Sequence, residues 1–150
     1  MSLKPGSGKG IDPSVLERAE QAVAAMADSY LEWAARDVGR LQAALAEARQ
    51  QPGDLTPIQR LREIAHEVRG QGGSFGFPLV SRIATSLYRL LRERATFPAA
   101  ALSVIDAHID ALRAVLAQRA RGDGGPTGQQ LAAGLEAMVE RMLAETPASA

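Results

Sequence analysis

The feature that most limits how this chain can fold is a long amphipathic stretch, residues 13–50, which no proline interrupts after its first position. Its apolar residues recur every three to five positions: Val15, Ala19, Ala22, Met26, Tyr30, Trp33, Val38, Leu41 and Leu45. This spacing predicts one apolar face on a helix of roughly 50 Å, at about 1.5 Å per residue. Asp12 is the expected N-cap, and Pro13 suits the first turn.

Four shorter amphipathic segments follow, at residues 57–75, 78–95, 98–121 and 128–145. The expected N-caps of three of them are Thr56, Thr96 and Thr127. The 28 alanines and 15 arginines favour helix, while aromatic residues make up only 4% of the chain. We therefore predict an all-α fold, an antiparallel four-helix bundle with a long first helix. An additional C-terminal helix is expected to cover the part of the first helix that extends beyond the bundle.

The length of 150 residues predicts a single domain, residues 12–146, between a disordered N-terminal tail at 1–11 and a short C-terminal tail at 147–150. The absence of cysteine excludes disulfides, thiolate zinc sites and cysteine nucleophiles. The formal net charge of zero argues against a general nucleic-acid binder. No apolar run is long enough to span a membrane, and no signal-peptide pattern is present. We expect a cytoplasmic monomer without nucleic-acid or membrane partners.

The 57–75 helix carries an unusual polar face. Its predicted core face consists of Ile58, Leu61, Ile64, Ala65, Val68, Gly72 and Phe75. His66 lies outside that face, and Gly70 and Gly73 lie on the same side as His66. Each glycine costs a helix roughly 1 kcal/mol relative to alanine, so glycine beside the imidazole needs a reason. One reason is that glycine at these two positions leaves the surface beside His66 open to a second protein. Arg69, one turn after His66, supplies a cation that could hold a phosphoryl group next to the imidazole.

The pattern His66-x-x-Arg69-Gly70, followed by Gly76, resembles the signature of the histidine phosphotransfer (HPt) family. The resemblance covers roughly residues 30–115 and includes the apolar frame and the helix that follows. It implies that His66 accepts a phosphoryl group and that Arg69 stabilises it. It also implies that Gly76 terminates the helix.

As a member of this family, the protein would carry a phosphoryl group between response-regulator receiver domains or from a hybrid histidine kinase. The resemblance implies no ATP site, no autokinase activity and no cofactor of its own, since magnesium would come from the receiver. Residues 57–94 carry an excess of four positive charges, which suits an acidic receiver pocket. The candidate partner contacts are Gln59, Arg62, Gly70, Gly73, Ser81, Arg82 and Thr85.

Two other functions stay open at this point. The run from His66 to Arg69 also resembles the start of the dimerisation box of histidine kinases, although Gly70-Gln71 stands where that box has Thr-Pro. A structural helical interaction module without phosphotransfer is the second alternative. His108 has no comparable setting and is expected at a solvated boundary, whereas Tyr30, Trp33 and Met26 are expected in the core.

Overall fold

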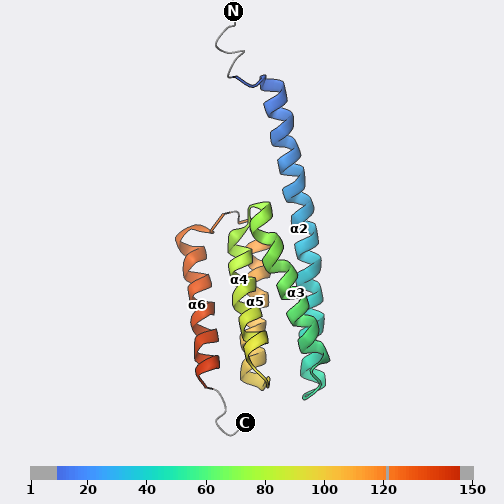
Figure 1. The fold of residues 1–150 in the computed structure, drawn as a ribbon, viewed down its shortest axis with the longest axis vertical. Helices are drawn as coiled ribbons and strands as arrows, with labels where there is room; N and C mark the ends of the chain where they lie inside the picture. Colours follow the sequence, from blue (N-terminus) through green and yellow to red (C-terminus); the bar gives the residue numbers. More distant parts are fainter. Residues whose placement is uncertain (1–9, 121, 146–150) are drawn as a thin grey trace, which may run out of the picture.

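Five α-helices run alternately up and down in the computed structural model, which describes residues 10–120 and 122–145 (Figure 1). The helices are α2 (Pro13–Gln50), α3 (Thr56–Gly72), α4 (Pro78–Glu93), α5 (Ala99–Ala117) and α6 (Gly125–Ala144). A short 3-10 helix, η1 (Gly73–Phe75), continues α3, and no strand occurs among the described residues. The prediction of an all-α antiparallel bundle with a long first helix and an additional C-terminal helix is confirmed.

The core lies among α2, α3, α4 and α5, each of which packs against two of the others. Its fully buried side chains are mostly aliphatic, and include Leu41, Leu61, Ile83, Leu87 and Ile109. The α3 residues predicted to face the core are buried, except that Phe75 is half-buried and stacks on Tyr30. The helical spacing therefore identified the inner face of α3 correctly.

The first third of α2 extends beyond the bundle and is not covered by another helix (Figure 1). No residue of α2 before Ala27 is buried, and Val23 and Met26 each remain 55% exposed. The prediction that the C-terminal helix covers this part is wrong, because α6 packs against α4 and α5 instead. The core placement predicted for Met26 and Trp33 is also wrong: the Trp33 side chain is 49% exposed. Tyr30 is buried as predicted.

The first helix begins as predicted, whereas the second uses a different cap. The Asp12 carboxylate accepts a hydrogen bond from the Ser14 amide at 2.9 Å, which confirms Asp12 as the cap of α2. At α3 the amide of Thr56 donates to the Asp54 carboxylate at 2.9 Å. Thr56 is therefore the first residue of the helix and Leu55 is at the N-cap position, while the Asp54 carboxylate accepts the hydrogen bond of the first helical amide.

The predicted caps of the last two helices are also wrong. Thr96 precedes α5 by three residues, because Pro98 has extended backbone angles and the helix begins only at Ala99. Thr127 lies inside α6, which begins at Gly125 after the left-handed Gly124 (φ +78°). The two glycines allow the chain to turn into α6 earlier than the threonine indicated.

Three predicted helix ends shift for identifiable reasons. The last turn of the 57–75 segment is 3-10 rather than α-helical. α4 ends before residue 95 because Arg94 has an extended backbone. α5 ends at Ala117 rather than 121, because the left-handed Arg119 (φ +53°) closes the turn. Of the predicted tails, 1–11 and 147–150, only residues 10 and 11 are described, and they are exposed and outside any helix. Residues 1–9 and 147–150 lie outside the described residues. None of the described helices combines the length and the apolar character that a membrane span requires.

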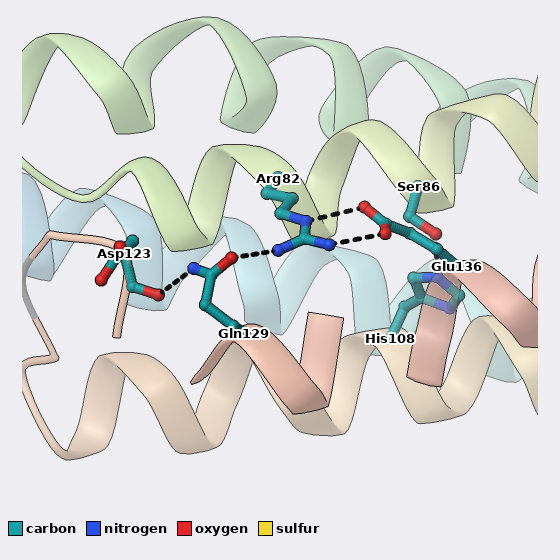
Figure 2. A network of polar contacts seen from close by, with 6 residues as sticks. All are labelled: Arg82, Ser86, His108, Asp123, Gln129 and Glu136. Atoms are coloured by element: carbon teal, nitrogen blue, oxygen red, sulfur yellow. Dashed lines mark hydrogen bonds and ion pairs between the residues drawn. The ribbon is translucent and has the colours of Figure 1, made fainter. Parts of the chain in front are cut away.

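His108 is fully buried, which contradicts the solvated position predicted for it. Its Nδ1 donates to the Val104 carbonyl at 2.8 Å, so Nε2 is the acceptor of the Ser86 hydroxyl, also at 2.8 Å. The ring lies beneath α6 near Glu136 (Figure 2). Both nitrogens are satisfied, and burial lowers the pKa of His108 below its usual value. This histidine is a structural residue of the core.

The lowered pKa of His108 predicts a loss of stability in mild acid. Below about pH 6.5 the unfolded chain protonates this imidazole while the native protein does not, so the free energy of unfolding falls as the pH falls. Thermal denaturation at several values between about pH 7 and pH 5 tests this. His108→Gln should lose less stability over that range than the wild type, whatever its stability at neutral pH. Equal losses in the two proteins would contradict the assignment.

Candidate functional site

His66 projects from the outer face of α3 and is exposed, as is Gly70 one turn later. The opposite face of the same helix is buried in the core at Ile64, Ala65 and Val68. Because α3 is fixed on one side by the bundle, the imidazole is held at a defined place while remaining accessible to a second protein.

Arg69 and Tyr88 surround the imidazole. A terminal nitrogen of Arg69, Nη2, lies 3.3 Å from Nδ1 of His66. The Tyr88 ring, from α4, has its centroid 5.4 Å from that of His66, and the Arg69 guanidinium lies 4.8 Å above the same tyrosine ring. The cation–π contact holds Arg69 beside the histidine. The arginine predicted to assist His66 is thus in contact with it.

Tyr88 is the member of this cluster that the sequence analysis missed. It follows Ser81 by seven residues and Thr85 by three, so the three lie on one face of α4. Two of them were selected as candidate contacts, and extending the same spacing by one turn would have found the third. Its half-buried position beside α3 explains why an aromatic residue occurs there.

The glycines of α3 have different roles. A Cβ built at Gly70 or Gly73 would meet nothing within 4 Å, so both leave open space on the side of His66. A Cβ at Gly72 would approach the Ser81 amide nitrogen to 2.9 Å and the Phe77 carbonyl oxygen to 3.0 Å. Gly72, which the sequence placed on the core face, therefore allows α3 and α4 to approach closely.

Gly76 ends the α3–η1 segment in a left-handed conformation, with φ +89°. Such an angle favours glycine, because a side chain would be strained there. The amide of Phe77 then donates to the carbonyl of Gly72 at 2.8 Å, which closes the turn into α4. The backbone at Gly76 has the conformation expected of a helix-terminating glycine.

The remaining predicted partner contacts differ in whether their side chains are exposed or are engaged with another helix. Gln59 and Thr85 are exposed, and the Thr85 hydroxyl donates to the Ser81 carbonyl at 2.8 Å. Arg62 is half-buried and donates to the Leu91 carbonyl at 3.0 Å, which connects α3 to the end of α4. The Ser81 hydroxyl donates to the Arg69 carbonyl and so connects the two helices beside the site. Arg62 and Ser81 therefore hold the α3–α4 pair together.

Arg82 is engaged by α6 (Figure 2). Its guanidinium donates to both carboxylate oxygens of Glu136, at 2.7 and 2.8 Å, and to the side-chain oxygen of Gln129. This pairing lowers the pKa of Glu136. Arg89, about two turns further along α4, also pairs with a glutamate of α6, Glu140. The excess positive charge predicted for residues 57–94 is therefore partly neutralised by the last helix.

A family model described as the Hpt domain matches residues 25–145. The protein therefore belongs to the Hpt domain family. Membership supports a phosphotransfer role in two-component signalling, and domains of this family generally interact with receiver domains or kinases. No curated protein and no solved structure was found to match the chain.

Substitution of Gly72, which lies against another backbone, and of Gly70, which lies in open space, should have opposite effects on stability. Gly72→Ala should destabilise the protein by about 1–3 kcal/mol, because the added methyl group would separate two backbones. Gly70→Ala, on the same helix but in open space, should leave stability unchanged or raise it by up to about 1 kcal/mol. Urea denaturation of both variants measures the difference. A stable Gly72→Ala variant would show that the helices do not depend on this contact.

Proposed function

We propose that the protein carries a phosphoryl group on His66 between receiver aspartates of a two-component phosphorelay. The main support is one arrangement: an exposed imidazole in contact with a guanidinium, on a helix face where Gly70 and Gly73 leave open space. A buried or crowded histidine could not reach a phosphoryl group held on another protein.

In the proposed transfer, a ring nitrogen of His66 attacks the phosphorus of the receiver's aspartyl phosphate. A phosphorus–nitrogen bond forms while the phosphorus–oxygen bond to the aspartate breaks, and the carboxylate leaves with the electron pair. The ring becomes a phosphoimidazolium, which can then lose its remaining N–H proton. The reverse step passes the group to a second receiver. Positioning and charge neutralisation supply most of the rate in such transfers.

Arg69 has to move before the ring can attack. Arginine only donates hydrogen bonds, so in its contact with Arg69 the Nδ1 atom is the acceptor, and the proton of the neutral ring is on Nε2. In this arrangement neither nitrogen has a free lone pair. The anionic oxygens of an incoming phosphoryl group are stronger acceptors than a neutral nitrogen. Their arrival therefore draws the guanidinium away from the ring and frees the imidazole at the same time.

The partners in this proposal are receiver domains, including that of a hybrid histidine kinase. We expect the receiver to supply the magnesium ion that neutralises the transferring group. The chain's own contribution is then limited to His66, to Arg69 and to an open docking face around them. This division of roles predicts that ATP alone does not label the protein.

Incubation with a receiver labelled on its aspartyl phosphate tests the proposed function directly. The protein should acquire a label that is labile in acid and stable in alkali, as expected of phosphohistidine. His66→Gln should abolish labelling, and His108→Gln, which changes the buried histidine, should retain it. If none of the receivers of the source organism labels the protein, the proposed function is wrong.

Gly70→Gln tests whether the open space beside His66 serves the transfer. The variant should fold as stably as the wild type, because a Cβ at this exposed position meets nothing within 4 Å and glutamine is a better helix former than glycine. It should slow phosphotransfer by at least about tenfold, because the new side chain blocks the approach of the receiver. Rapid-quench measurement of the transfer rate, with Gly134→Gln in the open space of α6 as control, checks this. Unchanged rates would contradict the proposed role of Gly70.

A further inference from the structure

An exposed tryptophan lies on the α2 side of the candidate site. Trp33 is 49% exposed, although it is the residue type with the most apolar surface to bury and the only tryptophan of the chain. It lines a shallow depression of about 350 Å³ between α2 and α3, together with Arg36, Asp37, Arg40, Glu67 and Gln71. An exposed tryptophan among arginines has the composition of a binding hot spot.

The depression adjoins the surface that carries His66. Glu67 and Gln71, which line it, directly follow His66 and Gly70 along α3. At about 100° per residue, Gly70 and the exposed Ser74 lie around the helix between His66 and these two side chains. Toward the C-terminal end of α3, only these two small residues therefore lie between His66 and the depression, while the exposed Glu63 lies in the same sector one turn earlier. A standard protein interface covers about 800 Å² on each partner, which is enough to include both.

The side chains on the two sides of α3 differ in their availability. On the α4 side, Arg82 and Arg89 are held by carboxylates of α6. On the α2 side, Arg40 pairs with Asp37 and Glu67, but Arg36 is exposed and has no hydrogen bond or ion pair within the described part of the chain. The tryptophan and one cation are therefore free for a partner on the α2 side.

From these observations we infer that Trp33 and Arg36 anchor the receiver domain that exchanges its phosphoryl group with His66. The inference rests on the proposed function and extends it, because it places the docking footprint over α3 and α2 instead of over α4 and α6. The receiver would cover the indole ring with an apolar recess and meet Arg36 with an acidic side chain. Trp33 would contribute to affinity, and His66 would remain the acceptor.

Because Trp33 is the only tryptophan, its fluorescence reports directly on this contact. The probe is a receiver that labels His66 and whose own tryptophans are replaced by phenylalanine. Titrating this receiver should shift the Trp33 emission to shorter wavelength, and His66→Gln should leave that shift intact. The same shift on concentrating the protein alone would show that a second copy covers Trp33, and would overturn the inference.

Variants complete the test. Trp33→Ala should weaken receiver binding by about tenfold or more, and Arg36→Ala by a smaller factor that decreases with added salt. Val23→Ala, an equally exposed apolar residue of α2 beyond the bundle, is the matched control and should bind normally. Normal binding by Trp33→Ala, while His66 still accepts label, would overturn the inference and leave the proposed function standing. If no receiver labels His66, both the inference and the proposed function are wrong.

Discussion

The close approach of α3 and α4 at Gly72 is the constraint on which the rest of the site depends. A side chain there would meet the backbone of Phe77 and Ser81, so only glycine lets the two helices reach this separation. The Ser81 hydroxyl bridges to the Arg69 carbonyl at the same place. This contact brings Tyr88 of α4 beside His66 and Arg69 of α3. A glycine on the buried side of the helix thus determines the surroundings of a histidine on its exposed side.

The sequence predicted best where periodicity and glycine placement agreed. Along α3 the apolar spacing separated the buried face from the face of His66, and the family pattern selected His66 and Arg69. The sequence predicted less well the burial of residues that depends on where another helix packs. His108 is predicted at a solvated boundary and Trp33 in the core, but His108 is buried beside α6 (Figure 2) and no helix of the described chain covers Trp33. α6 packs on the bundle through Ala132, Leu135 and Val139, and these long-range contacts are not visible in local spacing.

The last helix, α6, pairs with arginines of α4 and so reduces the positive charge that α4 offers to a partner. Counted along the chain, the arginines of α4 formed a basic docking surface, but in the folded protein Arg82 and Arg89 bind Glu136 and Glu140. Exposed ion pairs of this kind add little stability, on the order of 0–1 kcal/mol each. Their larger effect is that the guanidinium groups of Arg82 and Arg89 are already paired within the protein. Arg69 then remains as the cation in contact with the histidine, and the free aromatic and basic side chains lie toward α2.

The most direct test of the central claim is to locate the transferred phosphoryl group. Protein that has received the group from a receiver would be digested at alkaline pH, which preserves phosphohistidine, and its peptides analysed by tandem mass spectrometry. The structure predicts the modification on His66, whose imidazole is exposed, and none on the buried His108. A phosphoryl group on any other residue, with His66 unmodified, would contradict the account.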